Sequence, residues 1–215
     1  MDHRLKLLLG FGGKLLLFYI GLMALTLATG FAGAYLKWHC GCAGALWGEA
    51  TAMARIDCVG PKASENRYAT EVEYRFIDKQ ELERLTEQAK RSGQADVRLN
   101  VFGWSYNFMR IELFPLLFLI SLVLAYPASW RYRLRSLLVA VLLFIPLSFL
   151  LLYAKFLYQM HLDTTVFGHY QLPGFWAGFM QYLSLSLAEA RFIFILLLWG
   201  VVMVRWEDIR QLVKD

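Results

Sequence analysis

The chain has 215 residues, of which 58% are hydrophobic and 16% aromatic, and it carries a net charge of +5 at pH 7. Soluble domains are only about 45–50% apolar, so this composition favours a small membrane protein that crosses the bilayer several times. The basic residues stand at the ends of apolar runs rather than in one stripe. This pattern argues against a nucleic-acid partner and indicates membrane lipid as a partner.

Residues 1–36 predict a cytoplasmic N-terminus followed by a first transmembrane helix, with its apolar run at Leu15–Leu36. That run exceeds the core of a signal peptide, about 7–15 residues, so we expect an uncleaved anchor. Small residues recur at every fourth position of the run, which would let another helix approach closely. Either another span of this chain or the helix of a partner protein could pack there. The stripe consists of Ala24, Ala28 and Ala32.

Residues 37–110 hold most of the acidic residues and predict a small extracytoplasmic α/β module with the order β-β-α-β. Arg67–Ile77 alternates between apolar and charged residues, which is typical of a half-buried strand. Asp78 then begins a capping sequence for a helix that we expect to end near Arg91. The inward face of the first of these strands would contain Tyr68, Thr70, Val72, Tyr74 and Phe76.

Two further strands complete the predicted module. Thr51–Val59 is one candidate, and Ala95–Phe102 is the other. Alternation in the second candidate predicts that Val97, Leu99 and Val101 point inward. Trp104, Tyr106 and Phe108 follow and predict an aromatic belt where the chain re-enters the membrane.

Residues 111–153 predict a transmembrane hairpin with apolar runs at Ile111–Tyr126 and Leu137–Tyr153. Each run is long enough, or nearly so, to cross a hydrocarbon layer of about 30 Å. The turn between them, residues 127–136, should be cytoplasmic because short cytoplasmic loops are rich in Lys and Arg. We expect Pro146 to kink the second run. The arginines of the turn are Arg131, Arg133 and Arg135.

Residues 154–182 predict a second extracytoplasmic loop, and residues 183–215 predict a fourth transmembrane helix with a cytoplasmic tail. The expected fold is therefore a mainly α membrane protein with four transmembrane helices and a small α/β module between the first two. Both termini would be cytoplasmic, and the chain would cross the membrane several times.

Three cysteines, Cys40, Cys42 and Cys58, fall on the predicted outer side, where disulfides persist. Cys58 could pair with Cys40 or with Cys42, and one thiol would be left over. Inert thiols and a catalytic cysteine are the alternatives. His161, Asp163 and His169 of the second outer loop are weak candidates for a metal site, with ordinary loop polarity as the alternative. The sequence predicts no cofactor.

Four charged residues lie near the expected membrane boundary: Arg110, Glu112, Glu189 and Arg191. An isolated charge at that depth costs several kcal/mol, so such residues usually pair with one another. The sequence allows several arginine–glutamate combinations. The paired charges would either clamp the spans together or face a polar pocket at the outer surface.

The stretch Arg110–Pro127, RIELFPLLFLISLVLAYP, with the arginine-rich turn and the Leu137–Tyr153 run, resembles small accessory membrane proteins of exosortase systems. These bacterial systems process C-terminal sorting signals. The resemblance covers about a third of the chain. It implies a Gram-negative inner-membrane protein that works beside a sorting enzyme, and it supplies no catalytic residues.

Two functions follow from these patterns. The first is a non-enzymatic accessory or scaffold protein whose module contacts another membrane protein, either the sorting enzyme or its client. The alternative is a membrane-embedded thiol transpeptidase or protease that uses Cys42 or Cys58 with His161 and Arg191. It rests on the Cys, Arg and His that exosortases themselves use and on the activation of a thiolate by neighbouring groups.

Overall fold

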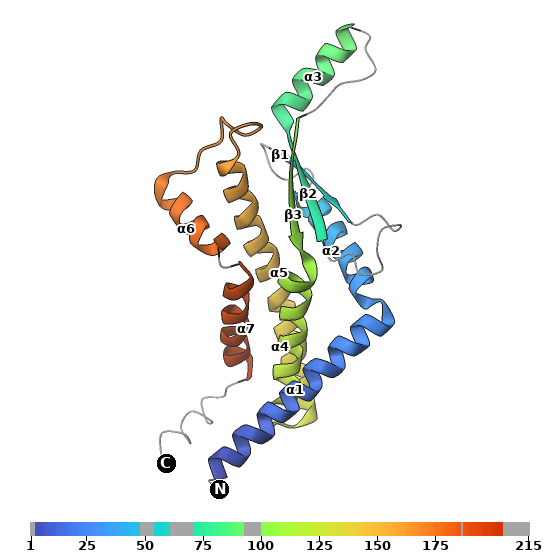
Figure 1. The fold of residues 1–215 in the computed structure, drawn as a ribbon, viewed down its shortest axis with the longest axis vertical. Coiled ribbons are helices and arrows are strands. Elements are labelled where there is room, and N and C mark those ends of the chain that lie inside the picture. The colour runs from blue at the N-terminus through green and yellow to red at the C-terminus, as the bar shows by residue number, and fades with distance from the viewer. Residues whose placement is uncertain (1–2, 48–53, 61–70, 93–99, 186, 204–215) are drawn as a thin grey trace. The chain divides into compact units, whose positions relative to one another are not determined.

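The computed structural model describes residues 3–47, 54–60, 71–92, 100–185 and 187–203 (Figure 1). The chain is mainly helical with one small sheet, and it divides into two compact units. The first unit contains Met1–Phe31, Arg110–Leu151 and Ser186–Asp215, and the second contains Ala32–Met109 and Leu152–Leu185.

Two helices are long and apolar enough to cross a membrane. They span Leu9–Thr29, within α1 (His3–Thr29), and Trp130–Leu162, which is α5. A shorter apolar helix covers Arg191–Met203 within α7 (Leu187–Met203). Membrane association is therefore supported by two helices in the described part of the chain, fewer than the four expected spans.

The first predicted span is wrong in its limits, because α1 ends at Thr29 and a separate helix, α2, runs from Phe31 to Trp47. The break falls at Gly30, whose φ is +69°. A left-handed residue of this kind ends a helix, and glycine adopts it without the steric penalty of a Cβ atom. The predicted alanine stripe is broken at the same point. Ala24 and Ala28 are exposed on α1, while Ala32 belongs to α2.

Two helices occupy the residues of the predicted transmembrane hairpin, with changes at both ends, and the second of them is long and apolar enough to cross a membrane. Its first helix opens with a π-helical turn, Met109–Leu113, and continues as α4, Phe114–Ala125. It ends as expected at Tyr126, where ψ is 135°, because a residue before proline disfavours the helical conformation. The second helix, α5, passes Pro146 without interruption and extends to Leu162, well beyond the predicted end at Tyr153. The predicted outer loop therefore begins inside α5 and also contains α6, Gly174–Leu185.

The β-β-α-β order of the module is confirmed: β1 (Ala54–Val59), β2 (Glu71–Asp78), α3 (Lys79–Ser92) and β3 (Val101–Asn107). The strands form an antiparallel sheet in the order β1-β2-β3. Asp78 caps α3 as predicted, since its Oδ1 accepts the backbone N–H of Gln80 at 2.8 Å. The predicted strand residues 51–53, 67–70 and 95–99 lie outside the described residues.

Alternation gave the right faces for β2 and the wrong faces for β3. Val72, Tyr74 and Phe76 are fully buried on β2, as expected. On β3, however, Val101 is exposed and Tyr106 is buried, which is a slip of one residue. Such a slip reverses every side chain of a strand. The predicted aromatic belt is also wrong, because Tyr106 and Phe108 belong to the core of the second unit.

Candidate functional site

The first unit contains a buried ion pair between α7 and the π-helical turn that precedes α4. Arg191 Nη1 lies 2.6 Å from Glu112 Oε1, and the two side chains are 2% and 0% exposed. Buried charges in apolar surroundings are costly unless they are paired and hydrogen-bonded. Further contacts of both side chains meet this requirement in part.

Arg191 also binds the backbone of the π-helical turn. Its Nη1 donates to the carbonyl oxygen of Ile111 at 2.6 Å. This carbonyl lies shortly before Pro115, a residue that has no N–H to donate within the helix. Arg191 Nη2 also donates to the carbonyl of Ser148 on α5, at 3.3 Å. The guanidinium thus joins three helical segments.

Ser148 is the third member of this cluster, because its hydroxyl donates to Glu112 Oε2 in a short contact. Glu112 Oε1 and Arg191 Nε have no hydrogen bond within the described part of the chain. The contact between Arg191 Nη1 and Oε1 is close enough for an ion pair, but Oε1 lacks a partner aligned as a hydrogen bond requires. The resulting cluster is electrically neutral and shielded from solvent. Its chemistry suits a clamp between helices.

The structure gives different surroundings to the charged residues that were predicted near the membrane boundary. It brings Glu112 and Arg191 together, whereas Arg110 is exposed on the same π-helical turn. Glu189 lies in α7, but its side chain is outside the described residues. The sequence analysis missed Ser148, whose only signal is a hydroxyl inside an otherwise apolar run.

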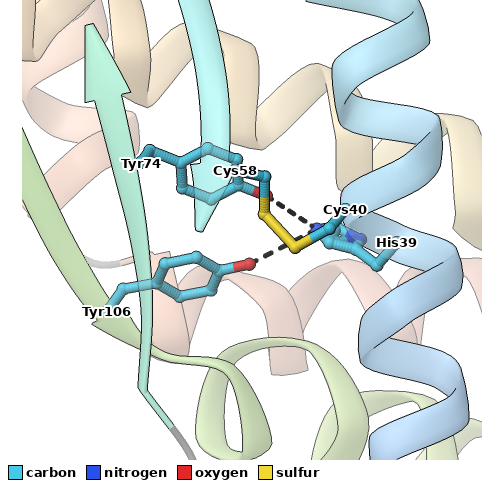
Figure 2. The surroundings of a disulfide bond; sticks show 5 residues. All are labelled: His39, Cys40, Cys58, Tyr74 and Tyr106. Carbon is cyan, nitrogen blue, oxygen red and sulfur yellow. Dashed lines mark hydrogen bonds between the residues drawn. A yellow bond between two sulfur atoms is a disulfide. The ribbon is translucent and has the colours of Figure 1, made fainter. Parts of the chain in front are cut away.

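The second unit contains a disulfide next to a buried histidine (Figure 2). Cys40 of α2 is bonded to Cys58 of β1, and Cys42 is a free cysteine. Beside the disulfide, His39 Nε2 lies 3.3 Å from the hydroxyls of both Tyr74 and Tyr106. Covalent and polar contacts therefore connect α2 to all three strands of the sheet.

Aromatic packing surrounds this connection. Phe156 of α5 is fully buried and lies between rings from the sheet and α2, with ring centroids 4.7 Å from Tyr74 and 5.0 Å from Trp47. Lys155 Nζ lies 5.8 Å from the centroid of the Trp104 ring, within the range of a cation–π interaction. His39 is 1% exposed, so these groups form a packed core rather than an accessible catalytic centre.

The weak metal candidates have separate partners. His161 Nδ1 accepts the backbone N–H of Leu172 at 3.2 Å, and His169 Nε2 lies 3.7 Å from Asp78 Oδ2. Asp163 accepts the hydroxyl of Thr165 at 2.6 Å and backbone N–H groups of its own loop. Over the described ranges, no group of three His, Cys, Asp or Glu side chains could hold a metal ion.

The pKa of Asp163 reflects two opposing effects. Partial burial raises the pKa of this carboxyl group, whereas hydrogen bonds from the Thr165 hydroxyl and from backbone N–H groups lower it. The hydrogen bonds prevail, and the pKa lies below its ordinary value. The ionised carboxylate of Asp163 therefore stabilises the turn after α5.

Most residues of the alternative thiol site are bonded to other groups. Cys58 is in the disulfide, His161 is bonded to the backbone of Leu172, and Arg191 is in the ion pair. Among the named thiols, only Cys42 is free in the oxidised protein. These contacts leave no paired nucleophile and base among the predicted members.

Comparison with protein-family models, curated proteins and solved structures finds no significant match to this chain. The class of the protein therefore follows from its own features. Its described residues are mainly helical, include two helices long and apolar enough to cross a membrane, and form a small antiparallel sheet.

Proposed function

We propose that the protein is a multi-pass protein of the bacterial inner membrane with four transmembrane helices and cytoplasmic termini. Its role is that of a non-enzymatic accessory or scaffold protein of an exosortase-type sorting system. The module between the first two spans lies outside the cytoplasm and contacts the sorting enzyme or its client.

The Cys40–Cys58 disulfide is the observation that carries this proposal. Disulfides persist in oxidising compartments such as the periplasm and are rare in the cytosol. Cys40 lies on α2, and only Gly30 separates α2 from the membrane-length helix α1. An anchored module with this disulfide suits a protein that holds a partner at the periplasmic face of the inner membrane.

The ion pair supports the two additional spans. A transmembrane helix needs about 20 residues, and Met109–Ala125 and Leu187–Met203 approach that length. Each segment carries one arginine and one glutamate, and the two charges that are buried within the described residues, Glu112 and Arg191, pair with each other. Their pairing is the usual form in which ionised side chains are accommodated in a membrane.

The surface of α1 supports contact with another membrane protein. An apolar groove of about 610 Å³ runs along this helix and is lined by eight of its residues: Gly13, Leu16, Leu17, Phe18, Ile20, Gly21, Leu22 and Leu25. A Cβ atom at Gly13 or Gly21 would meet nothing within 4 Å. Small residues at such positions allow a second helix to approach closely.

Topology is the first test. Reporter fusions near residue 80 and residue 132 should be active outside and inside the cytoplasm, respectively. A cytoplasmic signal near residue 80 together with an exported signal near residue 132 would overturn the topology and the accessory role with it.

Partner contact is the second test. A photo-crosslinking residue in place of Leu17, exposed in the groove, should crosslink to a co-expressed exosortase-type enzyme of the same organism. The matched control is Leu150, which is equally apolar and exposed on α5 and should not give this product. Equal crosslinking at both positions, or none at Leu17, would contradict the role.

A further inference from the structure

The aromatic face of α6 is exposed in the described chain. Phe175 and Tyr182 are 77% and 76% exposed, and Trp176 and Phe179 are 48% and 45% exposed. At about 100° per residue these four side chains share one side of the helix. The other side contains small and polar residues, among them Ala177, Gly178 and Gln181.

Such a helix needs a partner for its aromatic face. It has only 12 residues, and helices shorter than about 12–15 residues are marginal in water without tertiary packing. Within the face the rings contact one another, since Trp176 packs edge-to-face against Phe175 and Phe179. The described protein therefore leaves most of this apolar surface uncovered.

The composition of α6 indicates what covers it. Gly174–Leu185 contains no charged residue, so it offers none of the charge pairs that direct one protein to another. Trp and Tyr are enriched at membrane–water interfaces, where the ring is buried and its N–H or O–H group remains near the headgroups. α7 begins at Leu187 and exposes further apolar side chains, including Ile193 and Val201.

We propose that α6 is an interfacial helix that lies in the plane of the membrane, with Phe175, Trp176, Phe179 and Tyr182 inserted at the boundary between headgroups and acyl chains. The ligand of this surface is the lipid bilayer. This inference rests on the proposed membrane location of the protein. It adds a monotopic anchor to the spanning helices.

Depth measurements in the full-length protein test this inference. In a Cys42→Ser background with the disulfide intact, spin labels are placed singly at Phe175→Cys, Phe179→Cys, Gln181→Cys and Val201→Cys. The proteins are reconstituted in vesicles of phosphatidylethanolamine and phosphatidylglycerol. Collision with oxygen, which concentrates in lipid, is then compared with collision with a water-soluble nickel chelate.

The expected result is a several-fold higher ratio of oxygen to nickel collisions at Phe175→Cys and Phe179→Cys than at Gln181→Cys. Gln181 is the matched control because it lies on the opposite side of the same helix. A water-like ratio at all three α6 sites, with a lipid-like ratio at Val201→Cys, would overturn the interfacial helix and leave the membrane location intact. Labels on the aromatic face that are immobile and shielded from both reagents would overturn it in favour of a protein partner. A water-like ratio at Val201→Cys as well would overturn the membrane location itself.

Discussion

Arg191 and Glu112 form an ion pair of 2.6 Å between residues that are far apart in the sequence and almost completely buried. The pair connects α7 to the π-helical turn before α4, and through Ser148 it also reaches α5. Its energetic role can be tested separately from the role of the β-sheet module.

Replacing Arg191 alone should destabilise the first unit strongly. Arg191→Met leaves the Glu112 carboxylate buried without a counter-charge, and the expected loss in free energy of unfolding is about 3–5 kcal/mol. Unfolding of the purified protein by SDS in mixed micelles measures the loss. The double variant Glu112→Met/Arg191→Met should recover most of it, because no uncompensated charge remains. Arg110→Met, an exposed change on the same turn, is the control and should cost under about 1 kcal/mol. A loss that is no larger for Arg191→Met than for this control would refute the clamp.

Ser148→Ala removes the hydroxyl that donates to Glu112. An ionised acceptor that loses a buried donor should lower the free energy of unfolding by about 1–3 kcal/mol, again measured by SDS titration. Ser121→Ala is a matched control, since this buried serine donates only to the carbonyl of Leu117 in its own helix, at 2.7 Å. Its replacement should be nearly neutral. Equal effects of the two substitutions would mean that Ser148 does not stabilise the charge.

Replacement of the three cysteines should affect stability differently. Replacing Cys40 or Cys58 by serine opens a loop with a sequence separation of 18 residues, and the expected loss is about 3 kcal/mol in the stability of the second unit. Cys42→Ser should leave stability unchanged. Mass spectrometry of the alkylated, non-reduced protein should find the modification on Cys42 alone. Alkylation of Cys58 in protein isolated without reductant would refute the pairing.

Gly168→Ala should disturb the turn after α5. A Cβ atom at this position would lie 2.8 Å from the carbonyl oxygen of Thr164, which belongs to the rigid backbone. The expected cost is about 1–3 kcal/mol, as for other overpacked sites. Gly41→Ala is the control, because a Cβ there meets nothing within 4 Å and alanine favours the helix by up to about 1 kcal/mol. Thermal unfolding of both variants decides between these outcomes.

The lowered pKa of Asp163 predicts that the folded protein loses stability in acid. Its pKa in the folded protein is lowered, so its contribution is complete above the ordinary carboxyl pKa and disappears as the pH falls through the lowered folded value. Asp163→Asn should remove this part of the pH dependence, and thermal unfolding at a series of acidic pH values measures it. An identical acid profile in the variant would show that the hydrogen bonds to Thr165 and its neighbours do not stabilise the turn.

The sequence was most informative where one pattern stood alone. On β2, charged residues alternate with Val72, Tyr74 and Phe76, so only one face could be buried. Around the third predicted strand, the sequence offers two alternating sets that are out of phase with each other: Val97, Leu99 and Val101, and Phe102, Trp104 and Tyr106. Local alternation cannot choose between two such sets. The choice depends on Phe156, which comes from a distant helix.

The partners of the ion pair and the position of the helix break could not be predicted from the sequence alone. Charge and depth predicted that Glu112 would find an arginine, but two arginines were available within the sequence pattern. Ser148 had no distinguishing signal in an apolar run. Gly30 resembled the other glycines of an apolar segment, and glycine is common in membrane helices. Only its positive φ identifies the residue at which the helix ends.

The missing N–H of Pro115 has an evolutionary consequence. An ordinary residue at this position would add an amide N–H next to the π-helical turn whose Ile111 carbonyl accepts from Arg191. The imino acid and the arginine thus act on the same turn, although they lie on different helices. In homologous chains the two positions should covary, with a loss of the arginine tolerated best where the proline has also been replaced.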